Sequence, residues 1–245
     1  IRRPPRSTLF PYTRSSDLKG GHSGLEIDKG RGNAIKILNR LLLDLSGIGA
    51  RISSMEGGNK HNAIPREAEA VIFLPKKNLD RSRALVDAFC TLARAELATA
   101  EPDLAITMTV QKSAKGKVIA KGQQKKLLKT IAALPHGVTK MSADIPGLVE
   151  TSTNVAVVHT GKKEIAVATS QRSSVSSEIL EIVQAVSCVF ELGGAAVENT
   201  DGYPGWKPDL DSPILKIARS TYTSMYGKPP EVKAIHAGLE CGIIG

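Results

Sequence analysis

The sequence contains little cysteine, and its three thiols are far apart. They stand at positions 90, 188 and 241 of the 245 residues, and no two have the close spacing of a zinc or redox motif. This pattern argues against a disulfide scaffold and against a cysteine-based metal centre. Cys90 and Cys188 lie in apolar helical runs, where a buried structural thiol is the ordinary expectation.

Long apolar runs and aromatic residues are also scarce. No run approaches the roughly 20 apolar residues needed to cross a bilayer, and no secretory signal opens the chain, so we expect a cytoplasmic protein without membrane contact. Aromatic residues make up 4% of the chain. Residues 112–129 carry seven lysines, which could neutralise phosphates or form a solvated linker and helix face. Because this run has no arginine and no aromatic residue for base stacking, we favour the second interpretation and expect no nucleic-acid partner.

The two ends of the chain look abrupt. Residues 1–18, "IRRPPRSTLFPYTRSSDL", have no helical or strand period and contribute +3 to the formal net charge of +9. These residues resemble a translated sequencing adapter. We therefore expect this segment to be non-native or disordered and to form no part of the folded domain. Residues 231–245 predict a strand followed by an apolar segment without neighbours. Both ends therefore suggest an internal fragment of a longer protein.

Hydrophobic periodicity predicts a βαββαβ order in the first half. Apolar positions 34, 35, 37, 38, 41, 42 and 45 form the stripe of an amphipathic helix. The expected elements are a strand at 19–28, a helix at 31–45, strands at 50–58 and 67–75, a helix at 78–100 and a strand at 103–110.

The second half repeats this order loosely. We expect a helix at 123–134, strands at 147–160 and 164–174, a helix at 174–194 and a strand near 195–200. The predicted fold is α+β, with two tandem two-layer sandwiches of antiparallel sheets over residues 19–110 and 111–203. A Pro- and Gly-rich stretch marks a boundary, and residues 204–245 begin a different, α/β segment. Its helix would start at Ser212-Pro213 and end at Gly227.

The stretch "KGGHSGLEID" places His22 among glycines. His22 could be a metal ligand, a catalytic electrostatic group or a structural residue at a strand end. The chain has no HExxH, no HxH and no paired cysteines, so no metal ligand is assigned. Gly20, Gly21 and Gly24 would let a ligand or another backbone approach closely. We assign no functional role to three other histidines, His61, His136 and His159.

Three further residues are candidates for binding. Asn62 lies in the loop "GGNKHNAIP", which is either an ordinary turn or a place where a side-chain amide grips a carboxylate or carbonyl. Arg172 ends a strand just before a helix, where it is either a plain surface residue or part of a carboxylate cradle. Glu240 is four residues after His236, but the glycines around it argue against a helical ligand pair. We interpret Glu240 as a polar group in a substrate cleft and leave His236 unassigned.

Five motifs, taken in order, resemble a known family. They are "KGGHSGLEIDKGRGNAIKILNRLL", "GGNKHNAIPREAEAVI", "GLVETSTNVAVV", "DGYPGWKPDLDSPILK" and "EVKAIHAGLECGI". Together they are similar to the aminoacyl-histidine dipeptidases of the di-zinc metallopeptidase family that includes carboxypeptidase G and the aminoacylases.

The resemblance implies a fold and a chemistry. This chain would be the lid inserted into an α/β catalytic domain, together with the beginning of that domain's return. Two zinc ions would be the cofactors of the intact enzyme and activate a water. His22 would stabilise the tetrahedral oxyanion of a small peptide substrate. Asn62 and Arg172 would bind its carboxylate end, Glu240 would face the cleft near its other end, and the lid would form a homodimer or mimic one.

The sequence also departs from the family pattern. The motifs that supply the metal ligands are absent, so this polypeptide alone is predicted not to hydrolyse peptides. A different class of function, a non-catalytic oligomerisation or regulatory module, remains an alternative. It would require an apolar sheet edge or helix face for pairing.

Overall fold

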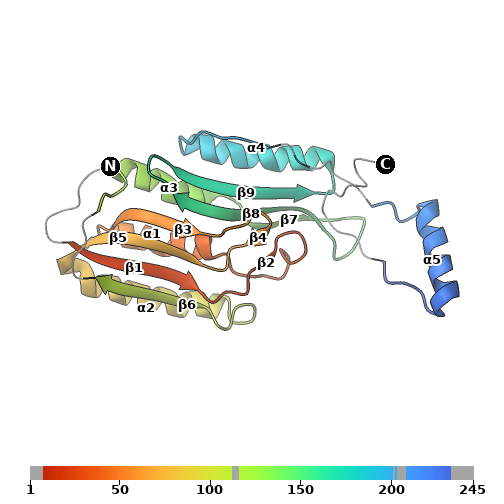
Figure 1. Cartoon of the computed structure of the whole chain (residues 1–245), viewed down its shortest axis with the longest axis horizontal. Helices are drawn as coiled ribbons and strands as arrows, with labels where there is room; N and C mark the ends of the chain where they lie inside the picture. The colour runs from red at the N-terminus through yellow and green to blue at the C-terminus, as the bar shows by residue number, and fades with distance from the viewer. Residues whose placement is uncertain (1–7, 112–115, 201, 203–207, 233–245) are drawn as a thin grey trace.

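A computed structural model describes residues 8–111, 116–200, 202 and 208–232, with side chains from residue 13. Its architecture is mixed α+β, with a seven-stranded antiparallel sheet and a separate two-stranded ribbon (Figure 1). The strands are β1 (Thr8–Ser16), β2 (Gly21–His22), β3 (Arg51–Gly57), β4 (Ala63–Ile64), β5 (Ala68–Pro75), β6 (Ala105–Gln111), β7 (Gly137–Met141), β8 (Val149–Thr160) and β9 (Ile165–Ser173). The helices are α1 (Ala34–Gly47), η1 (Lys76–Asn78), α2 (Leu79–Glu96), α3 (Lys121–Ala133), α4 (Ser176–Leu192) and α5 (Pro213–Tyr226).

The sheet runs continuously through both halves of the chain, in the order β6-β1-β5-β3-β8, and β9 pairs with β8 along most of its length. On the opposite side of β8, β7 pairs with the first part of the strand and β3 only at Gly57 with Val158. β8 residues 154–157 therefore lie between these two partners, and this stretch receives the loops that build the site described below.

One apolar core joins the helices to the sheet. The predicted stripe on α1 is buried throughout, including Ile35, Leu38 and Leu41 at 1% exposure or less. It shares a single cluster with side chains of β5, β8 and α4, such as Ile72 and Val155. Figure 1 shows α1, α2 and α3 behind the sheet and α4 beside β9. The core thus holds both halves together on the helical face, because each buried side chain contributes about 1.5–3 kcal/mol.

The α+β class and the antiparallel pairing are confirmed, but the division into two separate sandwiches is wrong. The halves share one sheet and one core. Residues 195–200 form no strand, whereas β7 forms without having been predicted. The strand expected at 19–28 is reduced to Gly21–His22, followed by turns, because glycines at 20, 21 and 24 favour turns over a ladder. Cys188 is exposed on α4 rather than buried.

The start of the chain differs most from expectation. Residues 1–18 were predicted to lie outside the fold, yet β1 occupies Thr8–Ser16 and pairs with β5 on one side and β6 on the other. The physical reason is that β5 and β6 would otherwise each present an unpaired edge. The strand fits its place imperfectly, since Pro11 supplies no N–H to the ladder. Among the described residues, three buried polar atoms of β1 have no hydrogen-bond partner: Thr13 Oγ1, Arg14 Nε and Ser15 Oγ.

We predict that removing these buried hydroxyls stabilises the protein. Thr13 is 0% and Ser15 1% exposed, so Thr13→Val and Ser15→Ala should each raise the free energy of unfolding by about 1 kcal/mol. Urea unfolding measures this. Ser16→Ala is the matched control, since Ser16 Oγ donates to Asp17 at 2.8 Å and its loss should lower stability. A lower stability for Thr13→Val would contradict the prediction.

The α5 helix stands apart from the sheet (Figure 1) and has no buried residue. Its predicted limits are confirmed, with Ser212 at the N-cap, Pro213 in the first turn and Gly227 at φ +69° in the C-cap. The strand predicted near the end of the chain lies outside the described residues. None of the helices seen in the described part is long and apolar enough to cross a membrane.

Candidate substrate-binding site

His22 and Asn62 are neighbours on the small β2–β4 ribbon. His22 pairs with Ala63, and the Ser23 N–H donates to the Asn62 carbonyl at 2.9 Å. The His22 and Asn62 residues are both exposed. Two candidates that are 40 positions apart in sequence are therefore brought together by one short ribbon.

The glycines before His22 leave space for an ion pair that supports the backbone of His22. Gly20 has φ +63°, and a Cβ on Gly21 would lie 2.6 Å from Glu26 Oε2. The Glu26 carboxylate accepts from the His22 N–H at 2.9 Å and pairs with Arg31 at 2.5 Å. The His22 amide first, and Arg31 in addition, lower the pKa of Glu26. The carboxylate is thus anionic at neutral pH and fixes the backbone that carries His22.

The imidazole of His22 is oriented by its own loop. The Gly24 N–H donates to His22 Nδ1 at 3.1 Å, so Nδ1 carries no proton in this arrangement. In a neutral imidazole the proton then sits on Nε2. His22 therefore presents an N–H donor on the side of the ring that faces away from its loop.

Arg172 approaches the same point from the second half of the chain. It lies on β9 opposite Ser152, and a Cβ built on Gly24 would lie 3.2 Å from Arg172 Cζ and 3.1 Å from His22 Cε1. The two side chains thus flank Gly24, which has no side chain to separate them. Burial lowers the pKa of Arg172, but the ordinary pKa of a guanidinium is so far above 7 that the side chain stays cationic at neutral pH.

The β2–β4 ribbon and the turns next to it are attached to β8 by residues that the sequence did not mark as candidates. Asn154 Nδ2 donates to the Ala63 carbonyl and Asn33 Nδ2 to the Val155 carbonyl, each at 2.8 Å. A Cβ on Gly58 would lie 1.9 Å from the Ala156 carbonyl oxygen, so only glycine fits there. Asn33 could have been found as the N-cap of α1. Asn154 could have been found as a polar residue inside an apolar strand.

Comparisons with known proteins identify relatives of this chain. Residues 14–101 match the family model described as "Peptidase dimerisation domain". The cytosol non-specific dipeptidase of Escherichia coli (strain K12) is 38% identical over 232 residues, 92% of this chain and 47% of that protein. The crystal structure of aminoacylhistidine dipeptidase from Vibrio alginolyticus is 37% identical and superimposes with a TM-score of 0.91, over 99% of this chain and 50% of that one. This chain is related to the aminoacylhistidine dipeptidases.

The chain spans about half the length of these dipeptidase relatives. The region that matches the dimerisation-domain model ends at residue 101, so it holds His22 and Asn62 but not Arg172. It begins inside β1, at Arg14. The part of β1 after residue 14 therefore corresponds to the family pattern as well as to a strand of the sheet.

Two further expectations of the dipeptidase resemblance concern Glu240 and zinc. Glu240 lies outside the described residues. Within the part that the structure describes, no group of three or more His, Cys, Asp or Glu side chains could hold a metal ion. These residues do not form a zinc site, and no step of the chemistry is assigned to a metal here.

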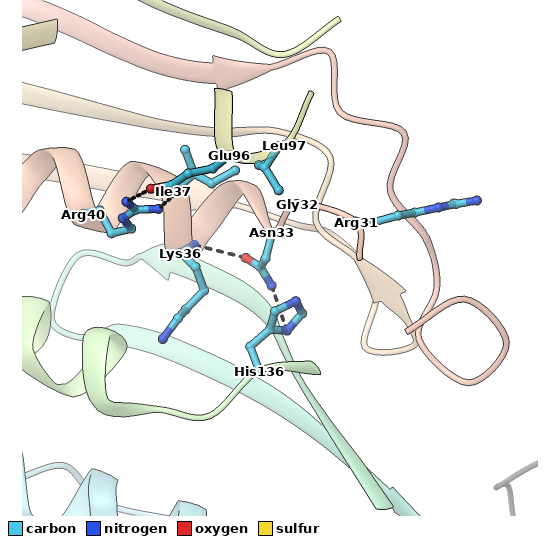
Figure 2. A pocket seen from close by; sticks show the side chains of 9 residues that line it. All are labelled: Arg31, Gly32, Asn33, Lys36, Ile37, Arg40, Glu96, Leu97 and His136. Carbon is cyan, nitrogen blue, oxygen red and sulfur yellow. Dashed lines mark hydrogen bonds and ion pairs between the residues drawn. The ribbon is translucent and has the colours of Figure 1, made fainter. Parts of the chain in front are cut away.

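An open hollow near the start of α1 contains His136, the one histidine among those described whose pKa is strongly shifted (Figure 2). Asn33 Nδ2 lies 3.3 Å from His136 Nδ1, and Lys36 Nζ donates to three carbonyls at the end of α3, the nearest being Leu134 at 2.7 Å. Burial first, and the charge of Lys36 in addition, lower the pKa of His136 to about 4. His136 is therefore neutral at pH 7, and the hollow is lined by residues from both halves of the chain.

Proposed function

We propose that this chain is the lid of a metal-dependent dipeptidase and that it grips the free carboxylate of small dipeptides, including those that end in histidine. The two zinc ions and the general base would belong to the rest of the intact enzyme. The relatives support this proposal, because one is a cytosol non-specific dipeptidase and the other an aminoacylhistidine dipeptidase. We further propose that the enzyme works in the cytosol, as the name of the Escherichia coli relative says of that protein.

The observation that carries the proposal is the meeting of His22 and Arg172 at Gly24. Arg172 is cationic and can hold a carboxylate through two parallel N–H donors. His22 offers its Nε2–H next to that grip, where it can donate to the oxygen of the neighbouring peptide carbonyl as negative charge develops there. Asn62 lies beside His22 and would supply an amide donor to the carboxylate.

The geometry explains a preference for chain ends. The guanidinium and the imidazole are separated only by the width of a glycine. A carboxylate held by Arg172 would therefore place the first peptide bond from the C-terminus at His22, which is the bond that a dipeptidase cleaves. Glu240 stays a proposed contact near the other end of the substrate.

A binding experiment tests this proposal on the chain itself. N-acetyl-histidine carries the free carboxylate and one peptide-like carbonyl, while N-acetyl-histidine amide lacks the carboxylate. In NMR titrations we expect the acid to bind with a Kd on the order of 10 mM and the amide to bind at least tenfold more weakly.

Substitution of Arg172 is the second part of the experiment. Arg172→Met should weaken binding of the acid at least tenfold, because it removes both charged donors. Arg40→Met is the matched control, because Arg40 pairs with Glu96 on α2 and not with a group on the ribbon. Equal binding of acid and amide, or equal effects of the two substitutions, would refute carboxylate recognition by Arg172.

A homodimer is a second proposal with its own support. Residues 14–101 match a domain described by its role in dimerisation, and α4 exposes Leu180 at 70% and Leu192 at 88%. We propose that these exposed leucines contribute to the dimer surface. Analytical ultracentrifugation of the wild type against Leu180→Glu would show a dimer that the charge disrupts, or a monomer in both cases if the proposal is wrong.

A further inference from the structure

Asn154 connects the turn that carries Asn62 to the strand that faces Arg172. It is 1% exposed on β8, and its Nδ2 donates to the carbonyls of Ala63 at 2.8 Å and His61 at 3.5 Å. These two acceptors fix the orientation of the side-chain amide, because its NH2 group and not its oxygen must face them. Oδ1 therefore points elsewhere, and it is buried without a hydrogen-bond partner among the described residues.

Arg172 has the complementary unpaired atom. Its Nε is buried and lacks a partner in the same part of the chain. Ser152 pairs with Arg172 and Asn154 with Ser170, so Asn154 and Arg172 are diagonal neighbours on one face of adjacent strands. Diagonal residues of an antiparallel pair are about 7 Å apart, within reach of long side chains.

An unpaired buried acceptor beside an unpaired buried donor calls for a common partner. Buried polar groups in folded proteins are nearly always hydrogen-bonded, either directly or through one bridging water. A hydrogen bond from the Arg172 Nε–H to Asn154 Oδ1, made directly or through one bridging water, would satisfy both atoms. The Nη groups of Arg172 then remain directed toward Gly24 and His22.

We propose that Asn154 is a positioning residue that holds the Asn62 turn through Nδ2 and the Arg172 guanidinium through Oδ1. One side chain would thus fix the spacing between the two groups that receive the carboxylate, although they come from different halves of the chain. The carboxylate rests on the proposed function. The positioning is a property of the free chain and can be tested without a ligand.

The test measures the solvent exchange of the Arg172 Nε–H by NMR in the 15N-labelled 245-residue chain. In the wild type we expect a protected Nε–H. Asn154→Leu removes the acceptor and should accelerate this exchange at least tenfold. Asn154→Asp keeps an acceptor for Nε while it places a carboxylate against the Ala63 carbonyl, so it should retain the protection and shift the amide signals of the Asn62 turn.

Asn39→Leu is the matched control. Asn39 is also 1% exposed, donates through Nδ2 to Leu128 in the other half of the chain, and has an Oδ1 without a partner in the described part of the chain, but it lies on α1 away from the ribbon. It should lose stability as Asn154→Leu does and leave the Arg172 exchange unchanged. A fast-exchanging Nε–H in the wild type, or protection that survives Asn154→Leu, would overturn the proposal.

N-acetyl-histidine separates this inference from the proposed function. If Asn154→Leu accelerates exchange and also weakens binding of N-acetyl-histidine at least fivefold, both are supported. If exchange accelerates but the wild type does not bind N-acetyl-histidine, Asn154 still positions Arg172 and the carboxylate function fails.

Discussion

Replacing His22 by alanine is expected to lower kcat for dipeptide hydrolysis by about 10²–10³-fold with little change in KM, because the Nε2–H acts on charge that develops only in the transition state. The assay uses a chimera in which residues 19–245 replace the matching half of the Vibrio alginolyticus enzyme, which superimposes on this chain with a TM-score of 0.91. His22→Gln, which keeps a donor near the same place, should recover part of the loss.

His61→Ala is the control for this prediction. His61 is exposed in the turn beside Asn62, and it contributes a backbone carbonyl to that turn. Its side chain has no role in the account, so kcat should change less than threefold. Equal losses for the two substitutions would mean that the ribbon acts through its shape and not through the His22 imidazole.

The second large effect is a pH dependence of stability that comes from His136. Its pKa falls from about 6.5 in the unfolded chain to about 4 in the folded protein. Between these values the unfolded state binds more protons, so stability is fully present above pH 6.5 and is lost as the pH falls toward 4. At pH 4.5 the loss should reach about 2 kcal/mol relative to pH 7.

His136→Gln isolates this contribution, because other titrating groups are common to both proteins. Urea unfolding at pH 7 and pH 4.5 should show a free energy of unfolding that decreases by about 2 kcal/mol more in the wild type than in His136→Gln. Parallel decreases in the two proteins would show that His136 stays solvated in the hollow.

Local patterns in the sequence predicted the parts of the fold that local physics determines. The stripe on α1 is buried at each predicted position, since a 3.6-residue period needs only one apolar surface to pack against. The limits of α5 followed from Ser212, Pro213 and Gly227, whose backbone preferences act within a single turn. The long helix predicted at the end of the second half also formed, as α4, from local patterns of this kind.

The features that were missed depend on partners distant in sequence. β1 lacks an apolar period, yet it forms because two strands at 68–75 and 105–111 leave a place between them. β7 is exposed on most of its residues, so alternation could not mark it. The meeting of Arg172 with His22 depends on how β9 aligns with β8, and no local pattern encodes that register.

The candidate residues themselves came from motif resemblance, and three of the four lie in the described part of the chain. His22, Asn62 and Arg172 converge there, while Glu240 stays a prediction. Asn154 and Asn33 lie within two of the quoted motifs but were not singled out, because their hydrogen bonds attach one half of the chain to the other. Such attachments become visible only when the register of the sheet is known.

The central claim is that the two halves of this chain form one site in which His22 and Arg172 act on the same small molecule. A crystal structure of the chain soaked with N-acetyl-histidine tests it most directly. We expect the carboxylate on the Arg172 guanidinium and the acetyl oxygen at hydrogen-bond distance from His22 Nε2. A carboxylate bound away from Arg172, or an acetyl oxygen directed away from His22, would contradict it.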